Sequence, residues 1–402
     1  MKFLLLNQAF YPDVVSTGQH LTDLALGLIA RGHEVTVVTS RRAYDNPQKM
    51  FPAHEIWCGI RIIRVSSTGL GKGAKWKRAV DFGTFTAFCL LRMLRLPRHD
   101  VVVALTSPPL IAFFGAWLAR IRRGKFVYWV MDFNPDQAIA AGWLKPRSLA
   151  ARLLERMSRF SLEHACRIIA LDRFMRDRIV AKGIPSLKIV VLAPWSHDDQ
   201  VQFAPAERER FRQAHGMNGK FVVMYSGNHS PCHPLDTLLE SARRLAHNPD
   251  VQFCFIGGGS EFHRIKQWLH TERLSNALCL PYQPLDQLAG SLSAADLHVV
   301  VMGEPFVGLV HPCKIYNILN VAAPVLYIGP QPSHVAEILA AANGQVLSAT
   351  ARHGDVEAVV QQVERLRQLT GNASRRPPDP ICARFAKDTL LPKLISELES
   401  VA

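Results

Sequence analysis

Residues 311–314, His-Pro-Cys-Lys, open a predicted helix and carry the side chains with the clearest chemical use. Lys314 would stand in the first turn of this helix, and two glycines, Gly303 and Gly308, precede it in the chain. A helix N-terminus offers free N–H groups and the positive end of the helix dipole, so it binds anions readily. The segment therefore predicts a phosphate site with Lys314 as its cation. The alternative is a lysine on a solvated helix start.

Two histidines form a second candidate group in SGNHSPCHPLD, which follows a predicted strand. His229 and His233 can bind a phosphate, and a histidine beside a phosphate becomes more basic. They can equally do no more than shape the turn before the next helix, and the sequence leaves both interpretations open. No cluster of carboxylates accompanies them, so we expect no metal site there.

Two carboxylates follow the apolar run KFVYWV, in the sequence MDFNPDQ. A carboxylate at a strand end can orient a substrate hydroxyl or act as its general base. Alternatively, Asp132 closes a turn and Asp136 caps a short helix. We favour a functional role for Asp132 and a capping role for Asp136, while both remain candidates for substrate binding.

The elements that must position these residues alternate along the whole chain. Short apolar runs, such as DVVVAL and VQFCFIGGG, alternate with amphipathic helical stretches. This alternation predicts α/β domains with doubly wound parallel sheets, which bind ligands at the carboxyl ends of their strands. A chain of 402 residues is too long for one ordinary core, so we expect two such domains.

Composition narrows the class of protein further. The start MKFLLLNQAFYP is interpreted as a first strand and not as a secretory signal, and no apolar run is long enough to span a membrane. Eight scattered cysteines without a C-x-x-C pair predict a reduced, cytoplasmic protein that has no structural zinc.

Charge is distributed unequally between the halves. Residues 1–200 hold 29 Lys and Arg against 15 Asp and Glu, whereas residues 201–402 hold 18 of each. The segment 71–99 is basic, aromatic and apolar, which predicts contact with an anionic membrane surface. The alternative is a core helix with a solvated basic face. Nucleic acid is a poorer candidate, because the positive charge accompanies apolar residues and no binding module is recognisable.

The order and spacing of these motifs resemble the retaining glycosyltransferases of family 4 over nearly the whole chain. The stretches that carry the resemblance are FYPDVVSTGQHLTDLALGLIARGHEVTVVTS, TSPPLIAFFGAWLA with MDFNPD, VQFCFIGGGSE and LSAADLHVV. It implies the GT-B architecture, in which two Rossmann-like domains face each other across a cleft. The expected parts are an acceptor-binding domain 1–200, a nucleotide-sugar domain 201–378 and a last helix in 379–402 that packs back on the first domain.

The resemblance also implies where the donor binds. Backbone N–H groups of Cys313 and Lys314, with the Lys314 ammonium, would lie near the diphosphate and stabilise the charge of the leaving group. Tyr282 would face the base, although it can also be an ordinary half-buried tyrosine. The residues expected at the donor site are Gly18, Gly227, Asn228, His229, His233, Gly258, Tyr282, Glu304, His311, Cys313, Lys314 and Asn317.

The chain departs from the family pattern at several of these places. The family carries two glutamates eight positions apart, which fall here on Leu309 and Asn317. Asn317 can still bind a ribose hydroxyl, more weakly than a carboxylate does, and Glu304 can replace the first glutamate through a shift of the loop. Many relatives have a phosphate-binding lysine where Cys232 stands, and two glycines where this chain has Gly18 alone.

The favoured function is therefore a retaining hexosyltransferase with Asp132 and Lys314 as catalytic residues. The donor is expected to be a UDP-linked hexosamine, used as a co-substrate without metal or other cofactor. The acceptor would be a lipid-linked or surface glycan, with the enzyme peripheral on the inner face of the cytoplasmic membrane. Two alternatives stay open: a non-catalytic nucleotide-sugar-binding protein or partner subunit, and a sugar-nucleotide epimerase.

Overall fold

The structure is a computed structural model that describes residues 1–13, 15–43, 46, 48–70, 75–196, 200–342, 344–370 and 380–401, without the side chains of residues 75, 76, 78 and 79. Residues 71–74 of the predicted membrane segment, 371–378 at the end of the predicted nucleotide-sugar domain and 379 of the predicted last part lie outside this set. The chain divides into two compact units. One comprises Met1–Pro194, Gly308–His311 and Asp388–Ala402, and the other comprises Trp195–Val307 and Pro312–Lys387.

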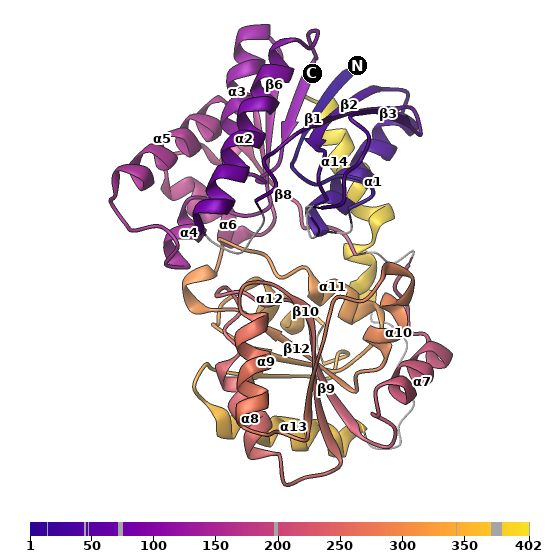
Figure 1. The fold of residues 1–402 in the computed structure, drawn as a ribbon. Coiled ribbons are helices and arrows are strands. Elements are labelled where there is room, and N and C mark those ends of the chain that lie inside the picture. Colours follow the sequence, from indigo (N-terminus) through magenta and orange to yellow (C-terminus); the bar gives the residue numbers. More distant parts are fainter. Residues whose placement is uncertain are drawn as a thin grey trace. The chain divides into compact units, whose positions relative to one another are not determined.

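The first unit is built on an eight-stranded sheet in the order β3-β4-β2-β1-β5-β6-β7-β8 (Figure 1). Only the β3–β4 pair is antiparallel among the described strand pairs. The strands are β1 (Lys2–Leu6), β2 (Glu34–Ser40), β3 (His54–Trp57), β4 (Ile60–Val65), β5 (Val101–Ala104), β6 (Lys125–Val130), β7 (Arg167–Ala170) and β8 (Ile189–Val191). Strands such as β5, VVVA, are buried along their whole length, as expected of a parallel sheet covered on both faces.

Helices connect these strands and cover the sheet. They are α1 (Ser16–Ala30), α2 (Lys75–Leu94), α3 (Ile111–Arg122), α4 (Asp136–Ala140), α5 (Leu149–His164), α6 (Arg173–Ala181), the 3₁₀ turn η1 (Ser186–Lys188) and the chain's last helix, α14 (Lys387–Glu399). The last helix packs on α1, since Arg31 Nη1 donates to Glu399 Oε2 at 2.6 Å and Ile395 lies against Gly27. The carboxyl end of the chain therefore belongs to the first unit.

The second unit has a six-stranded parallel sheet in the order β11-β10-β9-β12-β13-β14. Its strands are β9 (Phe221–Asn228), β10 (Val251–Gly258), β11 (Ala277–Leu280), β12 (Leu297–Val301), β13 (Val325–Ile328) and β14 (Ser348–Ala351). Its helices are α7 (Pro205–Ala214), α8 (Asp236–Arg244), α9 (Phe262–Thr271), η2 (Leu285–Gln287), α10 (Leu288–Ser293), η3 (Glu304–Phe306), α11 (Lys314–Asn320), α12 (His334–Ala341), α13 (Val356–Thr370) and η4 (Pro380–Phe385). The prediction of two doubly wound α/β domains is confirmed.

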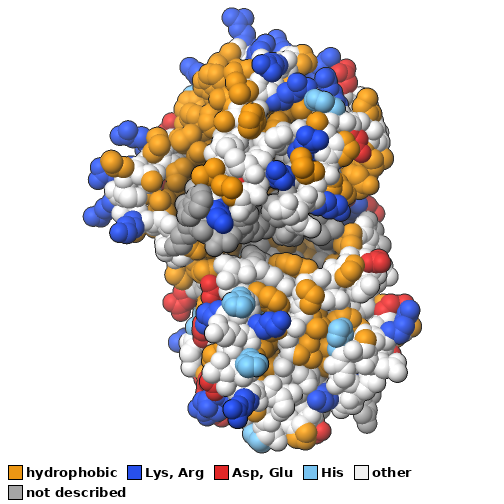
Figure 2. Space-filling view, viewed as in Figure 1, with side chains coloured by type: hydrophobic (Ala, Val, Ile, Leu, Met, Phe, Trp, Pro, Cys, Tyr) orange, Lys and Arg blue, Asp and Glu red, His pale blue; other side chains and the backbone are white. Residues whose placement is uncertain are grey.

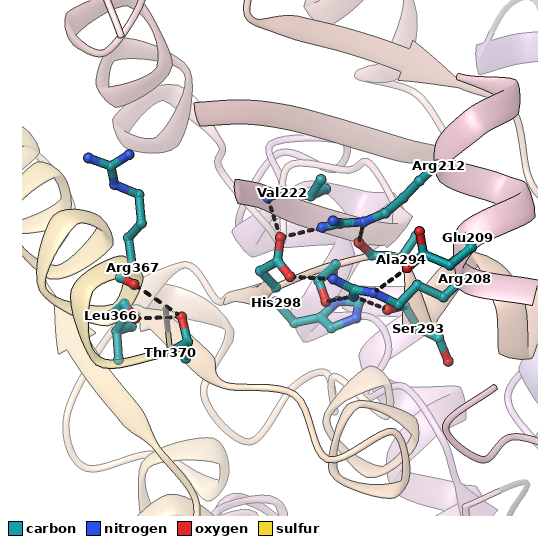
Figure 3. A network of polar contacts seen from close by, with 12 residues as sticks. Arg208, Glu209, Arg212, Val222, Ser293, Ala294, His298, Leu366, Arg367 and Thr370 are labelled. Carbon is teal, nitrogen blue, oxygen red and sulfur yellow. Dashed lines mark hydrogen bonds and ion pairs between the residues drawn. The ribbon is translucent and has the colours of Figure 1, made fainter. Parts of the chain in front are cut away.

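A partly buried ionic network fixes the start of β9 (Figure 3). Arg208 and Arg212 of α7 both bind the Asp296 carboxylate, and Arg208 Nη2 lies 2.6 Å from Asp296 Oδ1. The same carboxylate accepts a hydrogen bond from the Val222 amide at 2.8 Å. Arg208 binds Asp296 Oδ1 and Arg212 binds Asp296 Oδ2, so each charge in this network has a partner. The network holds α7 on the sheet at the end of β9 opposite to the candidate site.

Candidate functional site

Glycines line the carboxyl ends of two neighbouring strands in the second unit. In the register of β9 and β10, Gly227 is paired with Gly257 and Asn228 with Gly258. Gly227 and Gly257 have φ angles of 137° and 140°, which L side chains rarely adopt. A Cβ atom on Gly257 would overlap the Gly227 carbonyl oxygen. The backbones therefore approach each other so closely that only glycine fits.

Lys314 points its ammonium at these strand ends. Its Nζ lies 3.5 Å from the centre of the Tyr225 ring, and a Cβ atom on Gly227 would lie 2.9 Å from this nitrogen. The nitrogen is buried and has no hydrogen-bond partner among the described residues. Burial lowers the pKa of Lys314 well below its ordinary value. Lys314 is thus not a lysine on a solvated helix start, and among the described residues the face of the Tyr225 ring stabilises its charge.

His229 and His233 lie in the same surroundings. The His229 side chain is fully buried, packs edge-on to Tyr225 at 4.9 Å, and neither ring nitrogen has a hydrogen-bond partner in the described part of the chain. His233 donates from Nδ1 to the Val301 carbonyl at 2.7 Å. Burial, together with the nearby Lys314 charge, lowers the pKa of His229 to about 4 and that of His233 to about 3. Both rings are therefore neutral at pH 7.

This arrangement is suited to an anion. A buried ammonium without a hydrogen-bond acceptor and an imidazole with two unused nitrogens lie beside glycine-rich strand ends. An incoming diphosphate would supply acceptor oxygens and raise the pKa of each of these groups. The described residues of this site provide no carboxylate to neutralise Lys314 instead.

The other residues predicted for the donor site occupy several environments. Tyr282 is 50% exposed and lies over Gly258, where an added Cβ would be 2.9 Å from the Tyr282 ring. Asn228 accepts a hydrogen bond from the Tyr225 hydroxyl through its carbonyl oxygen at 2.8 Å. Glu304 is exposed in η3, whereas Cys313 and Asn317 are half-buried at the N-cap and in the second turn of α11.

His311 makes a contact that the sequence did not predict. It belongs with the first unit, where its Nδ1 lies 2.8 Å from Asp172 Oδ2, and both side chains are buried. The other Asp172 oxygen accepts from the Met175 amide and caps α6. This ring nitrogen therefore takes part in a structural contact within the first unit. Neither Asp172 nor Tyr225 was predicted, because no local motif marks them.

The carboxylates of MDFNPD differ sharply in their surroundings. Asp132 has no hydrogen bond or ion pair on its carboxylate in the described residues, and burial raises its pKa to about 6. Asp136 instead lies 3.0 Å from Lys182 Nζ, which also binds Glu155 at 2.5 Å. The capping role favoured for Asp136 is wrong, since the N-cap of α4 is Pro135 and no side chain caps it.

Gly18, the predicted donor residue of the first unit, is the third residue of α1. A Cβ atom there would lie 3.4 Å from the Ala9 backbone, so the position is already tightly packed. Close packing against Ala9 therefore explains a glycine at position 18 without any ligand.

Comparisons with known proteins agree with this fold. The family model described as "Glycosyl transferase 4-like domain" matches residues 17–195, and "Glycosyl transferases group 1" matches residues 207–310. WcaI of Escherichia coli (strain K12), named as a glycosyl transferase of colanic acid biosynthesis, is 24% identical over 80% of this chain and 81% of its own. WbjE of Pseudomonas aeruginosa, named as a glycosyltransferase, is 27% identical over 61% of each chain.

Solved structures show the same architecture. Sucrose-phosphate synthase from Thermosynechococcus elongatus superposes with a TM-score of 0.75 at 14% identity, with 100% of each chain covered. HepE of Anabaena in complex with UDP-glucose gives a TM-score of 0.72 at 16% identity, again with 100% of each chain covered. Two parallel-sheet α/β units, two glycosyltransferase domain models in the expected order and relatives named for the same activity establish that the chain is a glycosyltransferase of the GT-B fold.

Proposed function

We propose that the enzyme transfers a sugar from a UDP-linked donor, with retention, to a lipid-linked or surface-glycan acceptor. The observation that carries the donor proposal is the buried Lys314 ammonium, which has no hydrogen-bond partner among the described residues and lies against Gly227. Charge develops on the leaving diphosphate as the sugar departs, so a fixed cation there accelerates the reaction as well as binding the donor.

The identities of nucleotide, sugar and acceptor are proposed from the comparisons and from the family resemblance. UDP and UDP-glucose occupy the HepE structures, which favours a uridine nucleotide here. The choice of a hexosamine as the transferred sugar follows from the family resemblance of TSPPLIAFFGAWLA and MDFNPD. The name of WcaI refers to colanic acid biosynthesis, which favours a surface-glycan or lipid-linked acceptor. We expect transfer without metal, so that chelation by EDTA leaves the rate unchanged.

A transfer assay tests this function. Purified protein is incubated with radiolabelled UDP-N-acetylglucosamine, UDP-glucose or GDP-mannose and a polyprenyl-diphosphate-linked sugar in detergent micelles. The proposal expects label from a UDP-sugar to enter the organic phase, with the sugar in the α-configuration that retention requires. Transfer from GDP-mannose alone, or an inverted product, would contradict it.

Asp132 is proposed to orient the acceptor hydroxyl or accept its proton. In Asp132→Asn we expect the transfer rate to fall roughly 100-fold or more, the range for loss of a general base, and its rise with pH near 6 to disappear.

The folded state binds the Asp132 proton more tightly than the unfolded chain, so the free energy of unfolding falls as pH rises from about 4 to about 6. Asp132→Asn should lack this fall, which urea unfolding measures. A wild-type pH–rate profile in the variant would rule out the proposed role.

Membrane association is proposed from the exposed face of α2. Val80, Phe88, Leu91 and Leu94 are each 40–54% exposed, and their spacing puts them on one side of the helix. Phe85, Cys89 and Met93 are buried on the opposite side. Figure 2 shows hydrophobic and basic side chains together in this region of the surface. None of the described helices is long and apolar enough to cross a bilayer.

Cations accompany this apolar face. Arg95 follows α2, and the end of α3 exposes Arg120 and Arg123 beside Ile121, which is 52% exposed. Exposed apolar residues flanked by cations are typical of a surface that lies on anionic lipid. On this basis the enzyme is proposed to act at the inner face of the cytoplasmic membrane, where a lipid-linked acceptor would be available.

Leu91→Asp tests the membrane proposal. We expect its affinity for phosphatidylglycerol vesicles to fall about tenfold, because a charge replaces an apolar contact with the bilayer. Leu187→Asp is the matched control, since Leu187 is 89% exposed in η1, away from α2. Vesicle flotation measures both variants. Equal losses in the two variants would show that α2 is not the membrane contact.

A further inference from the structure

A pocket of about 470 Å³ lies in the first unit, apart from every residue assigned above to donor or acceptor binding. It is bounded by the antiparallel edge of the sheet and the carboxyl-terminal half of α2. Its lining residues are His54 and Ile56 of β3, Arg61 and Ile62 of β4, Arg92 of α2, and Glu55.

The side chains of two arginines in this pocket have no partner among the described residues. Neither the Arg61 nor the Arg92 guanidinium forms a hydrogen bond or an ion pair with them, and Arg92 Nε is buried without an acceptor. The nearby carboxylate of Glu55 is already neutralised, because Arg64 Nη1 binds it at 2.5 Å. The described lining therefore carries two positive charges without a counter-charge. Arg92 Nε is in addition a buried donor without an acceptor, which costs free energy.

The shape of these donors points to a phosphate. A guanidinium presents a planar set of N–H groups that matches phosphate oxygens, and it loses less hydration than an ammonium when it binds them. Two arginines from different elements can hold one such group from two sides. A carboxylate ligand would use the same donors, but it would leave one charge of the pair uncompensated.

The lining also carries an exposed apolar side chain. Ile56 is 80% exposed on the β3 side, and Leu91, which precedes Arg92 in α2, is 54% exposed. A phosphate attached to an apolar chain would thus place its head group on the arginines and its chain along α2. A soluble phosphate ester would use the arginines only.

We propose that this pocket binds a phosphate group, independently of the donor site. The phosphate comes either from the head group of an anionic phospholipid or from a soluble phosphate ester. The proposal does not depend on the identity of the sugar donor, and it adds a second anion site to the enzyme.

The test uses the full chain with Lys314→Met, so that the donor site contributes little to phosphate binding. Inorganic phosphate binding is measured by equilibrium dialysis with and without the added pair Arg61→Gln and Arg92→Gln. We expect the pair to weaken phosphate binding at least tenfold. The control pair Arg352→Gln and Arg365→Gln removes the same charge from exposed positions of the second unit and should change it less than twofold. Equal effects of the two pairs would overturn the proposal.

Vesicle flotation then identifies the source of the phosphate. A parallel loss of affinity for phosphatidylglycerol vesicles, with none for phosphatidylcholine vesicles, assigns the site to lipid head groups. Loss of phosphate binding with unchanged vesicle affinity assigns it to a soluble ester. If the variant with both glutamine substitutions does not fold, Arg92→Lys is used instead. It keeps the positive charge and loses the planar set of N–H donors of the guanidinium. It should weaken phosphate binding severalfold, and wild-type phosphate affinity in that variant would equally overturn the proposal.

Discussion

Replacing Lys314 by methionine is expected to lower kcat/KM for the nucleotide-sugar by roughly 10- to 150-fold. This range corresponds to the loss of a charge-assisted contact of about 1.5–3 kcal/mol. Methionine keeps the unbranched stem beside Tyr225 and removes the ammonium, so the loss reports charge and not packing. Steady-state kinetics with the UDP-sugar measures it. Lys266→Met, at an exposed position of α9, is the control and should behave as wild type.

The same substitution should stabilise the ligand-free protein. A buried ammonium without a hydrogen-bond acceptor costs free energy, which one ring face offsets only in part. The folded pKa of Lys314 lies below its ordinary value of 10.5, so the wild type gains stability as pH rises toward that value. Lys314→Met should lack this gain and unfold at higher urea concentration at pH 7. A variant that is both less stable and unchanged in kcat/KM would assign Lys314 to the core.

Gly257→Ala is expected to destabilise the fold by about 3 kcal/mol and to abolish donor binding. The added methyl group would overlap the Gly227 carbonyl, and the φ angle of 140° is unfavourable for alanine. Relief requires the ends of β9 and β10 to separate, which moves Gly227 away from Lys314. Urea unfolding and nucleotide titration measure the two effects.

Gly219→Ala separates overlap from backbone strain. Gly219 has a φ angle of 74° and open space where a Cβ would lie. Gly219→Ala should lower the free energy of unfolding by only about 1 kcal/mol and leave nucleotide affinity unchanged. Equal destabilisation by the two substitutions would show that the close approach of the strands contributes nothing.

Most of the fold could be predicted from local sequence patterns. Apolar runs such as VVMYSG and VQFCFIGG have the length and composition of buried strands, and their glycines mark the strand ends. The composition of 71–99 predicted a membrane-facing segment, with a core helix as the alternative, and the structure shows that α2 buries Phe85 and Cys89 while Phe88 and Leu91 remain exposed. Composition alone does not show which apolar residues have a partner, because that depends on which elements pack on the helix.

The partners of the site residues were less predictable. Lys314 could be chosen from its place at a helix start, but its contact with Tyr225 joins residues 89 positions apart and follows from the strand order β10-β9-β12. The ion pair of Asp136 with Lys182 likewise depends on how α4 and α6 lie in the first unit. Such pairs carry no local sequence signal.

The most direct test of the proposed donor site is a thermal-shift titration of the wild type and Lys314→Met with UDP, GDP, ADP, TDP and CMP. Binding to the native state raises the melting temperature. We predict a clear rise in melting temperature with UDP in the wild type, little or none with GDP and ADP, and loss of the UDP effect in Lys314→Met. A rise with UDP that persists at full size in Lys314→Met, or a rise confined to another nucleotide, would contradict a uridine diphosphate site built around this lysine.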